Sequence, residues 1–448
     1  MANSAHSPTR RFLKLAGMTA SIATKTVSNT LRSLNADDEQ KNAAKSKLFQ
    51  EIGIQISDTL GQMKGAAMKV GQIASQYKDV FPPEVANAIS KLQRQAPAVD
   101  FSEIKAQVEK ELGQPLEQVF STFHPEPFAA ASIGQVHRAT LQNGQDVVVK
   151  VQYPGVDEAC ESDLKQIRLA LRMMGMLKID KDLQDQLFKE IQESLANELN
   201  YQLEAENLEI ARTFHQQLDT KIIIPQVFKE YSTRHLLTLS FEPGDSIEQA
   251  STWPQTLRND LGKRLFTAMG QEIFYLKRFH CDPHPGNLAF RPDGSVIIYD
   301  YGGVKQLSDE QVHSFQQLIQ AARQNNIAEL EDILLHLNIL TEKQRFPTTL
   351  YAQWLEVLLR PLVNHYDFSS NTAHHDGMLL MKTSLKYWDI FKPSPHTLML
   401  NRTFTGHYWN LVHLKVNDDL NDLFYALVPD TAQQIVTTTD TSFKNGLI

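Results

Sequence analysis

The sequence has few cysteines, no long apolar run and no excess of basic residues. Its two cysteines, Cys160 and Cys281, provide no disulfide framework, which is typical of a reducing compartment. No stretch approaches the roughly 20 apolar residues that a membrane-spanning helix needs. The net charge of −8 argues against a nucleic-acid-binding protein, so we expect no nucleic acid among its partners. Nothing near Cys281 would activate a thiolate, so we interpret it as a small packing residue.

Acidic residues are also absent from the first 35 positions, which hold five basic residues. This composition predicts that residues 1–40 form a basic flexible segment or lie on an anionic membrane surface. An organellar transit peptide would have the same Ser/Thr-rich, acid-free composition. We therefore expect a mitochondrial or plastid protein if the segment is a transit peptide. Otherwise we expect a cytoplasmic protein, peripheral at the inner face of the membrane if it is bacterial.

The length of 448 residues is ample for a two-lobed core. Apolar spacing of three to four predicts a helical region over residues 36–95, broken at Pro82-Pro83 before a second helix over 84–94, and another helix over 101–119. The first contains Gly61, Gly65 and Gly71, and each costs about 1 kcal/mol relative to Ala in a helix interior. We interpret them as sites where another backbone packs closely. The predicted domains are residues 1–40, 41–126 (helical extension), 127–244 (N-lobe), 245–436 (helical C-lobe) and 437–448 (tail).

Small side chains form a predicted loop between two strands. Gly134 is the only glycine of this loop, and Ala restricts the backbone more than Gly does. We therefore expect a stiff loop that lets backbone N–H groups approach phosphates, with altered nucleotide selectivity. An Asn143-Gly144 hairpin turn then leads into a β-branched strand that carries Lys150, where kinases hold the α- and β-phosphates. A solvated strand lysine is the common alternative. The loop residues are Ala129, Ala130, Ala131 and Ser132.

Two further helices are predicted over residues 157–178 and 182–213. A strand lysine in a kinase needs a glutamate from a helix to fix its side chain. Glu198 and Glu204 are the candidates in the second helix. Six residues apart on one helix, they would point about 120° away from each other. We therefore expect them to have different tasks, although a solvated acidic face is the ordinary alternative.

An acid, an amide and a second acid follow in the order used by protein kinases. Asp282 precedes Asn287 by five residues, and Asp300 stands before a Tyr-Gly pair. In kinases these positions are the catalytic Asp, a metal-binding Asn and the metal-binding Asp of the D-F-G turn. The oxygens of Asn287 and Asp300 suit Mg²⁺. A turn-rich loop is the alternative. The predicted hairpin of strands 288–290 and 296–299 would place both ligands at adjacent strand ends, which favours the catalytic interpretation.

The remainder of the chain looks mostly helical. Apolar periodicity predicts helices over residues 309–323, 327–336 and 348–362. We find no catalytic constellation in this part of the sequence.

With these motifs in order, the chain resembles the UbiB/AarF-type atypical kinase-like family, whose eukaryotic members support coenzyme Q biosynthesis. The similarity runs from about residue 45 to at least residue 305. The family's K-x-G-Q motif matches Lys69-Val70-Gly71-Gln72, and its A-A-A-S loop matches Ala129 to Ser132. Lys150 matches the nucleotide-contacting lysine. The catalytic loop matches Asp282 to Asn287, and the D-F-G equivalent is Asp300-Tyr301-Gly302.

One motif departs from the family. The family's E-x-D appears as Glu198-Leu199-Asn200, so an uncharged amide replaces an acid. This departure puts any ion-pair role of that acid in doubt, while Glu204 aligns with the family's partner of the strand lysine.

The resemblance implies an α+β, protein-kinase-like two-lobed fold with an N-terminal helical extension over the active site. It also implies ATP and Mg²⁺ as cofactors. By this resemblance the catalytic residue is Asp282. The nucleotide-binding residues are Ala129, Ala130, Ala131, Ser132, Lys150 and Glu204, the metal ligands are Asn287 and Asp300, and the gating residues are Lys69, Gln72 and Glu198.

The same resemblance predicts an ATPase or atypical kinase that supports ubiquinone biosynthesis or membrane lipid homeostasis. Because the helix carrying Lys69 would occupy the space of a protein substrate, protein phosphorylation in trans is disfavoured. The expected partners are a prenylated quinone precursor or another lipid, a membrane surface, enzymes of ubiquinone biosynthesis and a second copy of the chain. Two alternatives stay open, a small-molecule or lipid phosphotransferase and a nucleotide-gated lipid-binding scaffold without turnover.

Overall fold

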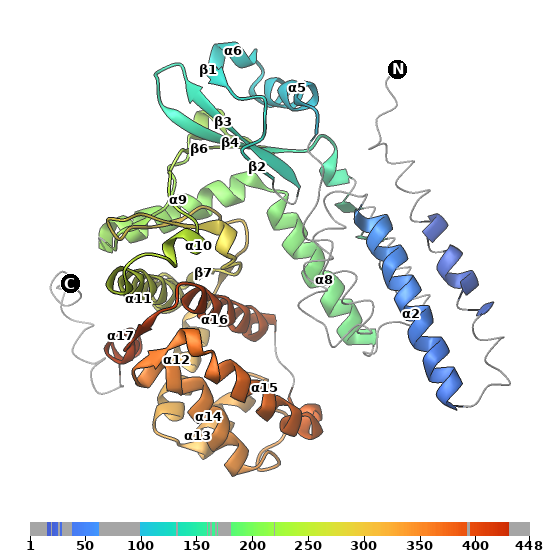
Figure 1. Cartoon of the computed structure of the whole chain (residues 1–448), viewed down its shortest axis with the longest axis vertical. Helices are drawn as coiled ribbons and strands as arrows, with labels where there is room; N and C mark the ends of the chain where they lie inside the picture. Colours follow the sequence, from blue (N-terminus) through green and yellow to red (C-terminus); the bar gives the residue numbers. More distant parts are fainter. Residues whose placement is uncertain are drawn as a thin grey trace. The chain divides into compact units, whose positions relative to one another are not determined.

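The chain forms an α+β structure that is mostly helical, as expected (Figure 1). Its backbone divides into two compact units, and each is described separately below. Unit 1 comprises residues 1–205 and 227–241, and unit 2 comprises residues 206–226 and 242–448. The computed structural model describes residues 16–18, 20–25, 27–28, 38–61, 99–130, 133–158, 160–161, 164–165, 168, 181–218, 220–391 and 395–429.

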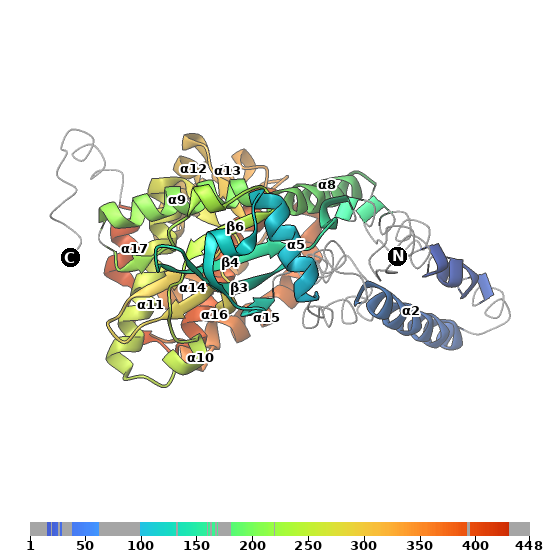
Figure 2. The same ribbon diagram turned by 90° about the horizontal axis from the view of Figure 1, so that it is seen from above.

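Unit 1 contains an antiparallel five-stranded sheet in the order β1-β3-β4-β6, with β2 paired to β3. Alternate side chains of β3 and β4 are buried, as the pleat of a half-covered sheet requires. Helix α5 packs against β4 (Figure 2). The strands are β1 (Phe120–Phe123), β2 (Ala129–Ala130), β3 (Gly134–Leu141), β4 (Asp146–Gln152) and β6 (Leu236–Ser240).

Two glycines of this sheet have clear backbone reasons. Gly144 adopts φ 85° in the turn between β3 and β4, which confirms the predicted hairpin. The turn is wider than two residues, because Leu141 N–H donates to the carbonyl of Gln145. At Gly134 a Cβ atom would collide with the backbone carbonyl of Val151. The pairing of β3 with β4 therefore requires this glycine whether or not a phosphate binds nearby.

The helical predictions before the sheet are partly confirmed. Helix α2 (Asp38–Gly61) lies within the helical region predicted over residues 36–95, and residues 62–98 lie outside the described residues. The prediction of one helix over 101–119 was wrong beyond α5 (Phe101–Leu112). Gly113 ends α5 in the left-handed conformation with φ 67°, and α6 (Leu116–Val119) is a separate turn.

The helix predicted over 182–213 is also divided, into α8 (Lys181–Glu198) and α9 (Tyr201–Leu218). Leu199 and Asn200 separate them. The Asn200 Oδ1 accepts a hydrogen bond from Leu203 N at 3.3 Å, so this amide caps the start of α9. The expected angle of about 120° between Glu198 and Glu204 was therefore wrong, because the two residues do not share one helix.

Unit 2 combines small β-sheets with helices. The strand pairs are β10-β7 and β11-β12, and a three-stranded sheet has the order β5-β9-β8. Strand β5 (Ile222–Ile223) pairs in parallel with β9. It therefore belongs to this sheet and not to the sheet of the predicted N-lobe. The other strands are β7 (Arg278–His280), β8 (Leu288–Phe290), β9 (Val296–Ile298), β10 (Val304–Gln306), β11 (Tyr366–Asp367) and β12 (Asn417–Asp418).

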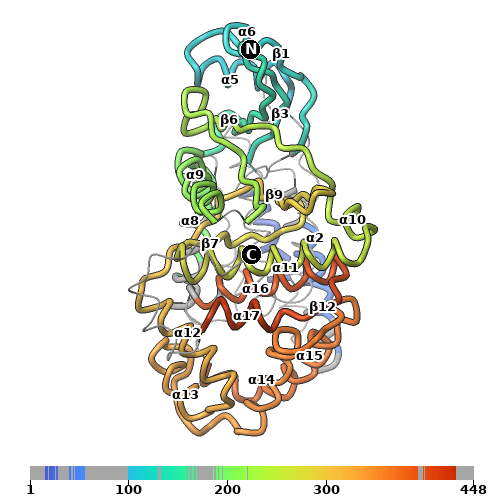
Figure 3. The backbone as a smooth tube through the Cα atoms, turned by 90° about the vertical axis from the view of Figure 1, so that its left-hand side faces the viewer, coloured from blue at the N-terminus to red at the C-terminus, as the bar shows by residue number. Residues whose placement is uncertain are grey.

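The helices of unit 2 follow the predicted positions closely. Prediction and structure agree over α12 (Asp309–Arg323) and α13 (Ile327–His336), and within one residue over α14 (Thr348–Val363). Helices α16 and α17 pack against α11 (Figure 3). The remaining helices are α10 (Ile247–Ala250), α11 (Gln255–Gln271), α15 (Thr372–Ser384), α16 (Pro395–His413) and α17 (Asn421–Leu427). Short helices are η2 (Lys229–Tyr231, in unit 1), η3 (Glu272–Leu276), η4 (Pro285–Asn287), η5 (Phe368–Ser370) and η6 (Leu385–Ile390).

In the part of the chain that the structure describes, no helix is both long and apolar enough to cross a membrane.

Candidate functional site

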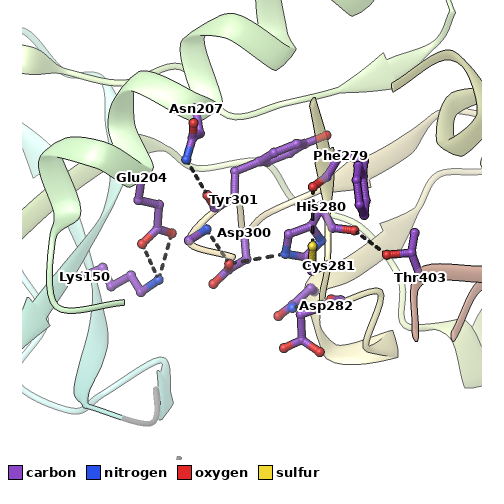
Figure 4. A network of polar contacts seen from close by, with 12 residues as sticks. Lys150, Glu204, Asn207, Phe279, His280, Cys281, Asp282, Asp300, Tyr301 and Thr403 are labelled. Atoms are coloured by element: carbon purple, nitrogen blue, oxygen red, sulfur yellow. Dashed lines mark hydrogen bonds and ion pairs between the residues drawn. The ribbon is translucent and has the colours of Figure 1, made fainter. Parts of the chain in front are cut away.

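A buried ion pair joins the central strand of unit 1 to the first turn of α9. Lys150 Nζ lies 2.8 Å from Glu204 Oε1 and 2.9 Å from Glu204 Oε2 (Figure 4). Only 15% of the Lys150 side chain and 2% of the Glu204 side chain are exposed. The Lys150 ammonium also lies 5.0 Å from the centre of the Tyr201 ring. The Glu204 carboxylate and the Tyr201 ring, in a desolvated setting, fix the ammonium group far more firmly than solvent would.

The small-residue loop is described only in part. Ala129 and Ala130 form β2, which pairs with Val136 and Gln135 of β3. Ala131 and Ser132 lie outside the described residues, as do Lys69 and Gln72. Glu198 is the last residue of α8 and is partly buried. The roles of these six predicted residues and of Glu198 stay predictions.

In unit 2, the loop after β7 turns tightly between Asp282 and Asn287. His284 N–H donates to the Asp282 carbonyl at 2.7 Å, and the imidazole of His284 accepts from Gly286 N at 3.0 Å. Asn287 Nδ2 donates to the same Asp282 carbonyl at 3.1 Å. Because the amide nitrogen faces the loop, the amide oxygen of Asn287 is the atom available to a ligand.

The register of β8 and β9 brings the two predicted metal ligands to adjacent strand ends. Leu288 pairs with Ile298, and Tyr299 N–H donates to the Asn287 carbonyl at 3.0 Å. Asp300 follows directly. Its carboxylate accepts from Gly302 N at 2.9 Å, and Oδ1 lies 3.6 Å from His280 Nε2 (Figure 4).

The chemistry of these ligands fits Mg²⁺. A carboxylate and an amide oxygen are hard donors, and Mg²⁺ in phosphate-transfer sites takes one or two such ligands beside phosphate oxygens and water. A larger ligand set is not needed. Among the described residues, no group of three or more His, Cys, Asp or Glu side chains is arranged to hold a metal ion.

A buried polar network around Glu272 holds the residues on either side of the candidate site, His280 and Tyr301. Tyr301 OH donates to Glu272 Oε1 at 2.6 Å, and His215 Nε2 lies 3.1 Å from the same oxygen. His280 N–H donates to Glu272 Oε2 at 3.3 Å. From the other side, Asn207 Nδ2 donates to the Tyr301 carbonyl at 3.2 Å (Figure 4). Tyr301, which follows Asp300, is thus held through both its backbone carbonyl and its side-chain hydroxyl.

Burial and hydrogen bonding together set the pKa values of this network. Burial alone would raise the pKa of Glu272, but the hydrogen bonds from His215 and Tyr301 hold that pKa below its usual value. Burial, with the Glu272 carboxylate alongside, raises the pKa of Tyr301 well above its usual value. A carboxylate thus accepts from a neutral phenol. Glu272 starts η3, a π-helical turn that continues α11, and such turns occur often at functional sites.

Cys281, between His280 and Asp282, is almost fully buried. Burial raises the pKa of its thiol to about 12. The side chain therefore stays protonated at neutral pH, which agrees with its interpretation as a packing residue.

Helix α16, which no sequence motif connected to the site, contacts the loop around Asp282 at several points. Arg402 Nη2 lies 2.8 Å from Asp282 Oδ1. Thr403 Oγ1 donates to the His280 carbonyl at 3.3 Å, and Asn410 Nδ2 donates to the Pro283 carbonyl at 2.9 Å. The contacting positions recur at helical spacing, but no sequence signal links them to a loop 120 residues earlier.

Comparison with known proteins places these motifs in context. The family model of the ABC1 atypical kinase-like domain matches residues 91–334. An Arabidopsis thaliana chloroplast protein, ACTIVITY OF BC1 COMPLEX KINASE 7, is 34% identical over 256 residues, which cover 56% of this chain and 37% of that protein. The mitochondrial atypical kinase COQ8B of Rattus norvegicus is 26% identical over 408 residues, covering 88% of this chain and 75% of the rat protein.

A solved structure is similar over most of the chain. The Mycobacterium tuberculosis protein Rv3197, in complex with erythromycin, aligns with a TM-score of 0.57 and 25% identity, covering 87% of this chain and 98% of that one. By contrast, the chain spans only 37% and 52% of the length of the first two curated relatives it matches, from Arabidopsis thaliana and Synechocystis.

Proposed function

Since the chain belongs to the ABC1 atypical kinase-like family, we propose that it binds ATP with Mg²⁺ and transfers the terminal phosphoryl group, chiefly to water. The observation that carries this proposal is the buried ion pair of Lys150 with Glu204. Desolvating a lysine is costly unless the ammonium group is paired. A buried lysine on a central strand is explained if its ammonium group must be held in place to bind phosphate oxygens, as in kinases.

Each residue then has a chemical task. MgATP, when bound, supplies the phosphoryl group and the divalent charge that offsets the phosphates. Lys150 binds phosphate oxygens, and Glu204 keeps it in place. Asn287 and Asp300 hold the metal through their side-chain oxygens. Asp282 orients the attacking water or hydroxyl group and accepts its proton.

Thermal stability with and without MgATP tests this proposal. A ligand present at a hundredfold excess over its Kd adds about 2.7 kcal/mol to stability, which corresponds to a rise in Tm of several degrees. We expect this rise for the natural chain and its loss in Asp300→Asn. The matched control is Asp260→Asn, an exposed position on α11, which should keep the full rise. An unchanged rise in Asp300→Asn would contradict the metal assignment.

We further propose that the activity serves ubiquinone biosynthesis or membrane lipid homeostasis, at a membrane surface and with a lipid such as a prenylated quinone precursor. Support comes from a relative named as a mitochondrial atypical kinase and others named as chloroplast kinases. The metabolites that accumulate in a deletion strain provide the test. A prenylated quinone precursor is the expected finding, whereas normal quinones would point to another lipid pathway.

The acceptor of the phosphoryl group can be established directly. Asp282 would serve water and a lipid hydroxyl equally well, because both nucleophiles need the same acid. Labelled phosphate recovered on an extracted lipid would favour a lipid phosphotransferase. Labelled free phosphate alone is what the ATPase proposal predicts.

A further inference from the structure

Helix α15 and the adjoining η6 expose large apolar side chains. Met378, Leu379, Met381, Leu385 and Trp388 are each between 38% and 57% exposed. Single exposed apolar residues need no explanation, but five within eleven consecutive positions form a local concentration. We call this surface the α15–η6 face.

Packing fixes which side of α15 faces outward. Trp354 Nε1 donates to the buried Ser384 Oγ at 2.9 Å, and a Cβ atom at Gly377 would lie 3.8 Å from Trp354 and Val357 of α14. Leu380 packs against the apolar cluster around Phe346. Helices α14 and α15 lie side by side (Figures 1 and 3). The inner side of α15 is thus already occupied, so its exposed apolar side chains cannot turn into the core.

The α15–η6 face is also basic. Lys382 and Lys386 are exposed, and Met378, Met381, Lys382 and Leu385 share one side of the helix by their spacing of three, four and seven.

The nearby acids are paired elsewhere. Arg360 Nη1 binds Asp376 Oδ2 at 2.8 Å, and Arg345 Nη2 binds Asp389 Oδ2 at 2.6 Å. The charge that this face offers to a partner is therefore positive.

We propose that the α15–η6 face docks on an anionic lipid surface. Apolar side chains interleaved with lysines, beside an indole whose N–H can stay in the polar layer, are the features that hold proteins at a bilayer interface. Lysine is depleted in protein–protein interfaces, so the two lysines among these apolar side chains favour a lipid surface over a protein partner. This inference rests on the proposed function, which includes a membrane as a partner, and it assigns a specific surface to that contact. The observations that support the inference lie outside the candidate active site.

Vesicle co-sedimentation of the full chain tests the proposal. The probes are vesicles of phosphatidylcholine alone and of phosphatidylcholine mixed with phosphatidylglycerol. The test variant is Leu385→Ser/Lys386→Gln. The matched control is Leu218→Ser/Lys229→Gln, which removes one exposed leucine and one exposed lysine elsewhere. A second control replaces Arg10, Arg11 and Lys14 by Gln to measure any contribution of the basic N-terminal segment.

We expect the natural chain to prefer the anionic vesicles. We expect the test variant to partition at least about 25-fold less, since a lysine near an anionic surface contributes about fivefold and a buried leucine at least as much. The matched control should partition like the natural chain. Added salt should weaken binding to anionic vesicles.

Two outcomes would overturn the inference. In one, the test variant binds as well as the natural chain, whether or not the N-terminal variant is impaired. In the other, no form binds vesicles and the test variant loses a dimer seen for the natural chain, which would make this face a contact between copies. The rise in Tm with MgATP is measured on the same samples. It tests the nucleotide proposal separately, so that failure of that proposal can be distinguished from failure of the docking proposal.

Discussion

The orientation of Asp282 depends on Arg402. Its guanidinium group lies 2.8 Å from the carboxylate, on side chains that are 25% and 41% exposed. An ion pair this accessible adds little to folding stability. Its main effect is geometric, because the planar guanidinium group restricts the directions in which the carboxylate can point. Arg402 is therefore a positioning residue for the candidate catalytic acid.

Changing Arg402 should lower turnover more than nucleotide binding. We expect Arg402→Gln to reduce kcat for ATP hydrolysis by about tenfold or more, with little change in KM for MgATP, since a misplaced catalytic group can cost up to about a hundredfold. Arg402→Lys keeps the charge but not the planar fork, so it should be intermediate. Steady-state kinetics provide the measurement. The control is Arg345→Gln, which breaks an exposed pair with Asp389. Equal kcat in Arg402→Gln and the natural chain would contradict the positioning role.

Residue identity alone indicated part of this site. Lys150, Asp282, Asn287 and Asp300 stand in short local patterns, and Glu204 was one of two candidates for pairing with Lys150. Arg402 was missed, because a lone arginine on a helix has no local pattern that points to a distant loop. The sequence also indicated nothing about Glu272, whose importance comes from burial beside Tyr301.

At the scale of elements, α16 packs closely enough on the catalytic loop to require a glycine. A Cβ atom at Gly406 would overlap the ring of Pro283, which is rigid and adjoins Asp282. Glycine in a helix otherwise costs about 0.5–1 kcal/mol relative to alanine. The close approach of two elements therefore outweighs helix propensity here.

Replacing Gly406 by Ala should destabilise unit 2 by roughly 1–3 kcal/mol and lower ATP turnover, because the Pro283 ring must shift. Gly377→Ala on α15 is the matched control. There a Cβ atom would meet Trp354 and Val357 at 3.8 Å, which is ordinary contact. The control should be stabilised by up to about 1 kcal/mol. Urea unfolding measures both variants, and stabilisation of Gly406→Ala would show that the loop is not tightly packed on α16.

Elements with strong apolar periodicity were predicted well, and interrupted ones were not. The bounds of α12, α13 and α14 came from a repeating apolar face. The breaks at Gly113 and Asn200 were missed, because the apolar pattern continues across them while the caps are set by one backbone conformation and one side-chain hydrogen bond. Asn and Asp are equivalent helix caps, so Asn200 caps α9 as well as an acid at this position would.

At the scale of the whole molecule, a stability that depends on pH follows from a partly buried histidine that stays neutral. His407 lies on α16, and its Nδ1 has no hydrogen-bond partner in the described part of the chain. Burial lowers its pKa from 6.5 to about 4, and the nearby Glu272 carboxylate offsets only part of this effect. The folded chain thus keeps His407 neutral at pH values where the unfolded chain protonates it.

The sign of the dependence follows directly. Between pH 6.5 and pH 4 the unfolded state binds more protons at this position, so stability falls as the pH is lowered through that range. The contribution lost by pH 5 is about 2 kcal/mol. As the pH falls below the usual pKa of a glutamate, Glu272 causes a second loss of stability, because its pKa is held low in the folded state. Urea unfolding at pH 7 and pH 5 should therefore show a smaller pH dependence for His407→Gln than for the natural chain. His313→Gln, at an exposed position of α12, should retain the full dependence. Equal dependence in all three chains would mean that the folded protein accommodates a protonated His407, and that the polar network beneath the catalytic loop is open to water.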